Sequence, residues 1–319
     1  PKALGDSKFL KALGAVAFKV HLLRPTTELN VDDDNVLRSA FEAAAKTKSL
    51  VSVHAEDRSL VTELESKLQA ARDTSPAAYL KAHPPEAEIR AIDRILRLTK
   101  DTNVHVHFAH VSTFKGLKLI MEAKQAGLPV TCEVTPHHLF LTEEVFFRLK
   151  GVALMTPPLR THQDTLRLVR ALKTGQVDLV ASDHAPHRLD EKMRENIWEV
   201  TPGIPGLETT LPLLLTQFNR ERISLRRVIE DLSEKPAKVF GFKTKGRLKT
   251  GYDADLTIVD LTKKFTIDSS KFYSKAKYSP FDGWKAIGKP VQTWVRGNLV
   301  MDDGMIVADP GTGRVIGVA

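Results

Sequence analysis

The 319-residue sequence has very little cysteine and few aromatic residues, and both shortages limit what the protein can be. Cys132 is the single cysteine, so a disulfide framework is excluded and a reducing, cytoplasmic setting is expected. Aromatic residues make up 7%, and no basic stripe interleaved with aromatics accompanies the net charge of +8. We therefore expect no nucleic-acid partner, and we attribute the basic balance to a small anionic substrate.

Long apolar runs are also missing. No segment approaches the ~20 apolar residues that span a bilayer, and no basic-then-apolar leader opens the sequence. We expect no association with a membrane. The first residue is Pro1 and not Met, so we expect the natural protein to begin earlier.

Short apolar segments alternate with amphipathic ones up to about residue 240, which is typical of βα units on a parallel sheet. The predicted strands are Val16–Leu22, Leu50–His54, Val104–His110, Val130–Val134 and Leu179–Ser182. The predicted helices are Val36–Lys46, Glu86–Thr99, Phe114–Ala126, Gln163–Leu172, Leu207–Gln217 and Leu225–Phe240. In residues 241–319, glycines separate the short predicted strands Leu256–Val259, Thr293–Val295 and Leu299–Met301, which indicates a small β-rich region packed on the first part.

Two architectures fit residues 1–240. They hold five to six βα units, whereas a closed (β/α)8 barrel needs eight units and ~250 residues. The first architecture is a TIM-type barrel that lacks its first strands, so that about strands four to eight are present. The second is an open five-stranded α/β sheet, complete in itself. The residues at the strand ends favour the incomplete barrel.

Four chemically capable residues lie within or at the end of four predicted strands: Lys19, His54, His110 and Asp183. Alone, a histidine at a strand end is usually a hydrogen-bonded structural residue, and an aspartate there usually caps a helix. A lysine within an apolar strand needs a partner or a lowered pKa, because burying an ammonium is costly. Since the carboxyl ends of barrel strands form the active-site mouth, the four together predict a zinc site.

Other histidines receive different interpretations. His105 and His107 form a His-x-His pair in the middle of a predicted strand, on a face that alternation does not share with His110, so we predict structural roles for both. His21 alternates onto the same face as Lys19, where it could line a pocket.

The sequence resembles the amidohydrolase superfamily and, within it, the dihydroorotases, over nearly its whole length. The motifs that carry the resemblance are Cys132-Glu133-Val134-Thr135-Pro136-His137-His138-Leu139-Phe140-Leu141, Ala181-Ser182-Asp183-His184-Ala185-Pro186-His187, Pro202-Gly203-Ile204-Pro205-Gly206-Leu207-Glu208-Thr209 and Ser279-Pro280-Phe281-Asp282-Gly283-Trp284. A less discriminating match, shared with the wider superfamily, is Gly251-Tyr252-Asp253-Ala254-Asp255-Leu256.

The resemblance implies a role for each candidate residue. Lys19 would be N-carboxylated and bridge two zinc ions, and His54 and His110 would bind the second zinc. Asp183 would bind the first zinc and act as the catalytic acid and base. On the substrate side, His187 would bind the substrate carboxylate, Thr156 would stand where many dihydroorotases have an asparagine for the pyrimidine ring, and His137 would lie near the substrate.

The implied reaction is the reversible closure of N-carbamoyl-L-aspartate into L-dihydroorotate in pyrimidine biosynthesis. The first zinc would also need a His-x-His pair followed by arginine, and no segment of this sequence stands in that context. The alternatives are an allantoinase or hydantoinase, which share the lysine, and a non-catalytic homologue acting as an assembly subunit. The resemblance also allows a homodimer and an association with aspartate transcarbamoylase.

Overall fold

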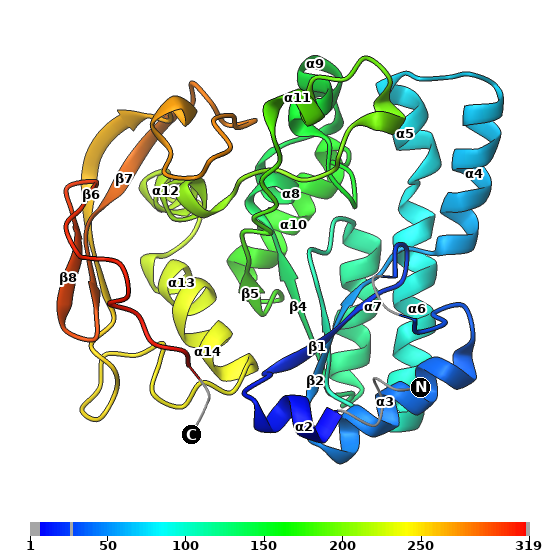
Figure 1. The fold of residues 1–319 in the computed structure, drawn as a ribbon, viewed down its shortest axis with the longest axis horizontal. Coiled ribbons are helices and arrows are strands. Elements are labelled where there is room, and N and C mark those ends of the chain that lie inside the picture. The colour runs from blue at the N-terminus through cyan, green and yellow to red at the C-terminus, as the bar shows by residue number, and fades with distance from the viewer. Residues whose placement is uncertain (1–6, 26–27, 317–319) are drawn as a thin grey trace.

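The computed structural model describes residues 7–25 and 28–316, and its central element is a parallel sheet of five strands (Figure 1). The strands follow one another across the sheet in chain order, and every neighbouring pair is parallel. They are β1 (Ala17–His21), β2 (Leu50–His54), β3 (Val106–Phe108), β4 (Val130–Val134) and β5 (Leu179–Val180). The expectation of a parallel α/β fold is confirmed, with β1 and β5 at the two edges of the sheet.

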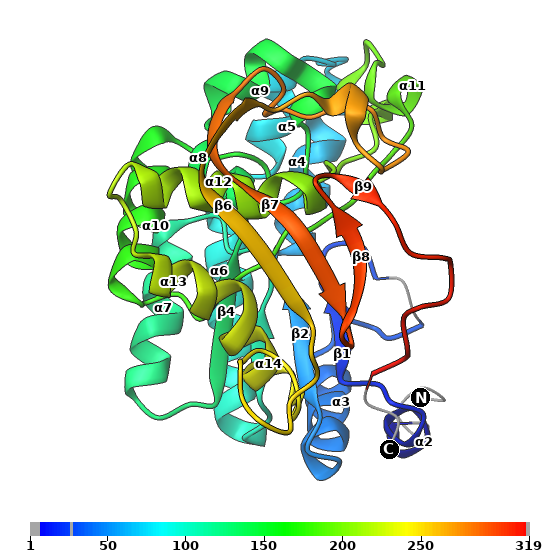
Figure 2. The same ribbon diagram turned by 90° about the vertical axis from the view of Figure 1, so that its left-hand side faces the viewer.

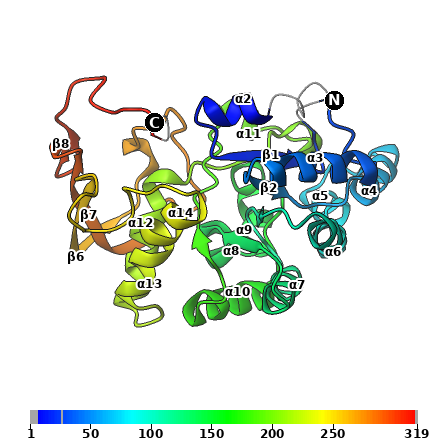
Figure 3. The same ribbon diagram turned by 90° about the horizontal axis from the view of Figure 1, so that it is seen from below.

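Helices follow the strands and cover the sheet. They are α2 (Ser7–Ala12), α3 (Asp34–Lys46), α4 (Arg58–Ala70), α5 (Pro76–Ala82), α6 (Pro85–Thr102), α7 (Phe114–Gln125), α8 (Pro136–Phe140), α9 (Glu143–Leu149), α10 (His162–Thr174), α11 (Leu189–Lys192), α12 (Leu207–Asn219), α13 (Leu225–Ile229) and α14 (Lys235–Val239), with short turns η1 (Lys150–Ala153), η2 (Ile197–Glu199), η3 (Glu230–Glu234) and η4 (Ser269–Lys271). Seen from below, α3, α6, α7 and α10 form an arc outside the strands (Figure 3). None of the described helices is long and apolar enough to cross a membrane.

Side-chain caps fix where several helices begin. Asp33 accepts a hydrogen bond from the Asn35 amide at the start of α3, and Asp57 accepts one from Leu60 at the start of α4. Each carboxylate satisfies an amide that the helix itself leaves without an acceptor. The connections from β1 and β2 are thereby held in place beside the carboxyl ends of the strands.

Several predicted elements have other bounds in the structure, and two of these differences have a clear physical reason. The predicted strand Val104–His110 shortens to Val106–Phe108, because His110 turns into the left-handed region with φ = 37°. The predicted helix Leu225–Phe240 is divided by the π-helical turn Glu230–Glu234. Pro236 lies in the first turn of the helix that follows, and its missing N–H explains why a regular α-helix is interrupted there.

A second sheet follows in the C-terminal region. Its strands β6 (Leu256–Thr266), β7 (Lys285–Val295), β8 (Asn298–Asp302) and β9 (Met305–Ile306) are antiparallel and adjacent in chain order. Figure 2 shows this sheet beside α12 and α13. The contact between β7 and α12 is close, because a Cβ on Gly288 would lie 2.6 Å from the Leu215 Cβ.

Two buried clusters form the core. The larger one lies between the parallel sheet and its helices and includes Phe41, Ile92, Phe108, Leu117 and Leu168. The smaller one joins α5, α9 and the loops beyond β5 to the C-terminal region, and it includes Tyr79, Phe146, Ile204, Leu213 and Phe281. The second cluster therefore anchors the loops that lie above the strand ends.

Candidate metal centre

The carboxyl ends of the parallel strands bring the predicted residues to one side of the sheet. His54 ends β2, where it pairs in register with His21 of β1, and Lys19 lies two residues earlier on β1. His110 follows β3, and Asp183 follows β5. Both of these residues have left-handed backbone, with φ = 37° and 44°. Left-handed non-glycine residues are strained and cluster at functional sites, so their place directly after two strands supports a functional role.

His54 and His110 form the tightest part of this arrangement. The Nδ1 of His54 lies 3.0 Å from the Nε2 of His110, and both side chains are buried. Burial, together with the nearby His54 and Lys19, holds the pKa of His110 well below its ordinary value, so its imidazole is neutral. The two nitrogens that face each other can therefore offer lone pairs to a cation.

A buried carboxylate behind His54 fixes its tautomer. The Glu56 Oε2 lies 2.7 Å from the His54 Nε2 and also accepts a hydrogen bond from the Thr156 hydroxyl at 3.0 Å. The Oε1 of Glu56 lies 3.1 Å from the Nδ1 of His83. Burial raises the pKa of Glu56, but hydrogen bonds from His54 and His83 outweigh it and hold this pKa well below its ordinary value. An ionised Glu56 keeps the proton of His54 on Nε2 and leaves Nδ1 free, as in carboxylate–histidine–metal arrangements.

Lys19 and Asp183 lie within electrostatic reach of each other. Lys19 lies on the edge strand β1, where part of its side chain reaches solvent. The protein around its ammonium group nevertheless removes enough water to lower its pKa, while the charges of Glu133 and Asp183 act in the opposite direction. Burial raises the pKa of Asp183, as does the Glu133 charge, while Lys19 and His54 lower it. Lys19 is thus more easily neutral, as carbamate formation requires, and the lowered pKa expected for a lysine in this strand is confirmed.

Glu133 and Glu56 are acidic residues of the site for which the sequence suggested no role. Glu133, on β4, lies 3.0 Å from the Nε2 of His107 and accepts a hydrogen bond from the His110 amide at 3.3 Å. His105 and His107 also contact the Thr131 hydroxyl, in agreement with their predicted structural roles. Glu133 could have been recognised in the sequence, because a carboxylate inside an otherwise apolar strand needs a partner.

The donor set fits a zinc ion only in part. Two imidazoles converge, and the buried Nδ1 of His110 has no hydrogen-bond partner among the described residues. In the part of the chain that the structure describes, however, no group of three or more His, Cys, Asp or Glu side chains is arranged to hold a metal. The structure joins His54 to His110, and it forms no hydrogen bond or ion pair between Asp183 and either histidine among the described residues.

The predicted substrate-side residues occupy different surroundings. His187, on the loop after β5, is partly exposed, with its Nε2 3.0 Å from the Pro202 carbonyl oxygen. The hydroxyl of Thr156 donates to Glu56 and is engaged beside the histidine pair. His137 is buried in α8, and its Nε2 has no hydrogen-bond partner in the part of the chain that the structure describes. The ring of His21 stacks on His54 at 3.7 Å, so His21 lies at the site.

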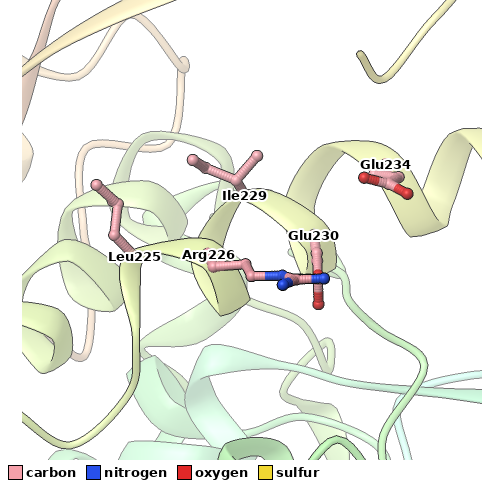
Figure 4. Close-up of a pocket in the computed structure, with 5 residues that line it drawn as sticks. All are labelled: Leu225, Arg226, Ile229, Glu230 and Glu234. Atoms are coloured by element: carbon pink, nitrogen blue, oxygen red, sulfur yellow. The ribbon is translucent and has the colours of Figure 1, made fainter.

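A surface hollow elsewhere on the molecule is separate from these residues. It lies along α13 and η3 and is lined by Leu225, Arg226, Ile229, Glu230 and Glu234 (Figure 4). Arg226 pairs with Glu230 at 2.6 Å, and Glu234 pairs with Arg247, so each charged side chain of the lining has a partner of opposite charge. This hollow contains no candidate catalytic residue.

Known proteins resemble the chain over most of its length. A dihydroorotase of Methanothermobacter thermautotrophicus is 41% identical over 266 residues, which cover 83% of this chain and 59% of that protein. An L-hydantoinase of Paenarthrobacter aurescens is 36% identical, and the match covers 99% of this chain and 70% of that protein. A dihydroorotase of Bacillus cytotoxicus is 39% identical, with coverage of 92% and 67%. The chain thus spans about 60–70% of the length of these relatives.

Solved structures agree with the sequence relatives. The L-hydantoinase from Arthrobacter aurescens superimposes with a TM-score of 0.95 at 35% identity, covering 99% of this chain and 71% of that one. A D-hydantoinase superimposes with a TM-score of 0.92 at 31% identity, covering 98% and 70%. The model of the amidohydrolase family matches residues 11–300. By sequence and by fold, the chain belongs to the amidohydrolase family.

Proposed function

We propose that this chain is the larger part of a zinc-dependent enzyme that opens and closes cyclic amides, and that its reaction is that of a dihydroorotase. The observation that carries the proposal is the pair of buried imidazole nitrogens, 3.0 Å apart, with Glu56 bound behind one of them. Dihydroorotases and hydantoinases among the relatives support the reaction class.

Lys19, His54, His110 and Asp183 would hold the metals. His54 and His110 would bind one zinc, Asp183 would bind the other, and Lys19 would contribute its carbamate to the donor set. The zinc of Asp183 would also need a His-x-His pair that this sequence does not supply, because His105 and His107 are bound to Thr131 and Glu133. When bound, paired zinc ions lower the pKa of water towards ~7 and polarise a carbonyl group.

The residues of the chain would move protons and orient groups. In the hydrolytic direction, the carboxylate of Asp183 accepts a proton from the attacking water and then delivers it to the leaving amide nitrogen. His187 would contact the substrate carboxylate, and a chain with a net charge of +8 would favour a dianionic substrate.

Substrate assays of the full-length protein test this proposal. We expect zinc-dependent interconversion of N-carbamoyl-aspartate and dihydroorotate, and we expect His187→Ala to remove most of this activity because the carboxylate contact is lost. Turnover of hydantoins without turnover of dihydroorotate would reject the dihydroorotase assignment and leave the broader class intact.

A hydantoinase is the second candidate. The TM-score of 0.95 with an L-hydantoinase supports it, and so does the engagement of the Thr156 hydroxyl by Glu56, which leaves no evident donor for a pyrimidine ring. A hydantoinase substrate lacks the carboxylate that His187 would bind. The His187→Ala variant should therefore keep most of its activity on hydantoins if this candidate is right.

An assembly subunit without catalysis is the third candidate, and it includes a homodimer or a complex with aspartate transcarbamoylase. We place the protein in the cytoplasm, in keeping with its single cysteine. Metal analysis separates this candidate from the enzymes, since an intact protein with less than one zinc per chain would support assembly alone.

A further inference from the structure

Lys192, the last residue of α11, is a fully buried lysine that the reaction does not use. Its side chain is 1% exposed. Its ammonium group donates to the carbonyl oxygens of Leu154 at 3.0 Å, Thr201 at 2.7 Å and Gly203 at 2.7 Å. An ammonium has three N–H donors, and each of them has one acceptor here.

The three carbonyls belong to two loops beside the candidate site. Leu154 lies two residues before Thr156, whose hydroxyl contacts Glu56. Thr201 and Gly203 flank Pro202, whose carbonyl contacts His187. Lys192 itself lies in the segment that follows Asp183 and His187, so its ammonium joins that segment to both loops. Figures 1 and 2 show α11 at the same end of the molecule as α5 and α9.

Close backbone packing surrounds the same point. A Cβ on Gly151 would lie 1.9 Å from the carbonyl oxygen of Lys192. A Cβ on Gly203 would lie 2.7 Å from the carbonyl oxygen of Ala185. The Gly203 amide also donates to the Leu154 carbonyl at 2.9 Å. The absence of side chains at Gly151 and Gly203 allows the loops to approach closely enough for one ammonium to reach all three acceptors.

Charge pairing does not explain why this lysine is buried. Lys192 forms no ion pair with any described residue, and burial lowers its pKa to about 7. A buried ammonium without a counter-ion costs stability, and an apolar side chain would fill the space at a lower cost. The directed N–H bonds are therefore what this lysine contributes.

We propose that Lys192 is a positioning residue that holds the loops of Thr156 and His187 in place on the substrate side of the site. The expected effect on catalysis rests on the proposed function. The expected effect on the loops rests only on the hydrogen bonds of Lys192. Without the ammonium, the carbonyls of Thr201 and Gly203 lose a buried partner and the two loops can separate.

The test compares Lys192→Met with Lys173→Met, which removes an exposed lysine of α10. In hydrogen exchange, we expect the amides of Leu154 and Gly203 to exchange at least about tenfold faster in Lys192→Met and unchanged in Lys173→Met. In the zinc-loaded full-length enzyme, we expect KM to rise about tenfold or more with a smaller change in kcat. Exchange at the wild-type rate, or a fall in kcat with KM unchanged, would overturn the proposal.

The unmutated protein provides a second test if Lys192→Met does not fold. The amides of Leu154, Met193 and Gly203 are all hydrogen-bonded. Hydrogen exchange should give the same opening free energy for all three, because the Lys192 ammonium links their segments. Unequal opening free energies would overturn the inference. If the wild-type enzyme binds zinc but turns over no cyclic amide, the proposed function fails, and these exchange rates still decide the role of Lys192.

Discussion

Replacing Glu56 with glutamine tests the candidate metal centre most directly. Glu56 accepts contacts from His54, Thr156 and His83 at 2.7, 3.0 and 3.1 Å. Glutamine keeps the volume, but it removes the charge and turns one acceptor oxygen into an NH2 donor. Whichever way the amide lies, either His54 or His83 then faces a donor instead of an acceptor.

The consequence reaches the metal through the tautomer of His54. If the NH2 group faces Nε2, the proton of His54 must move to Nδ1, the atom that lies 3.0 Å from the His110 Nε2. A protonated Nδ1 cannot bind a cation. Loss of such an outer partner typically costs 10- to 100-fold in metal affinity, so we expect Glu56→Gln to weaken zinc binding by about 1.4–2.7 kcal/mol.

A chelator competition with zinc, at constant pH and salt, measures this change. Glu65→Gln is the matched control, because Glu65 lies on the far side of His83, 3.2 Å from its Nε2, and is partly exposed. We expect that control to bind zinc within about twofold of wild type. A folded Glu56→Gln protein that binds zinc as tightly as wild type would refute the argument that the Glu56 carboxylate prepares His54 for the metal.

Three further predictions follow from the structure. Asp183→Asn should keep the fold and lower kcat by about 10²- to 10⁴-fold, because the amide cannot carry the transferred proton; steady-state kinetics with less than a tenfold loss would contradict this role. Gly151→Ala should destabilise the protein by about 1–3 kcal/mol in urea unfolding, because its Cβ would meet the Lys192 carbonyl at 1.9 Å, whereas Gly313→Ala, with open space around it, should have no effect. Burial lowers the pKa of Lys192 from 10.5 in the unfolded chain to about 7 in the folded protein. Between these pH values the unfolded chain binds one more proton than the folded protein. The contribution of Lys192 to the free energy of unfolding therefore rises with pH. Urea titrations from about pH 6 to 9 should therefore show wild type gaining about 2 kcal/mol relative to Lys192→Met, and a constant difference would argue against the lowered pKa.

The sequence predicted the parallel strands well because their signal is local. Apolar β-branched runs mark Leu50–His54 and Val130–Val134, and the structure has both strands with these bounds. The C-terminal strands β6 and β7 are each 11 residues long, much longer than predicted. The exposed positions of β6 beyond Val259 are polar, as in Thr262 and Lys264, so the apolar pattern found only the first part of that strand.

The sequence predicted site residues only where the residue type at the end of a strand indicates a metal ligand. His54 and His110 meet as expected, but the roles of His83 and Lys192 depend on contacts between distant segments. Lys192 lies in a highly charged stretch and resembles a surface residue, yet its acceptors are 9, 11 and 38 residues away. No local pattern specifies such contacts.

The backbone at Asp183 has a consequence for attempts to make this protein more robust. Its φ of 44° is unfavourable for a residue with a Cβ, and burial penalises its charge at neutral pH. Glycine would relieve both penalties and remove the proton carrier. Directed evolution that selects only for survival at high temperature would therefore enrich glycine at position 183 and yield thermostable but inactive proteins. Activity must be screened in every round of such a selection.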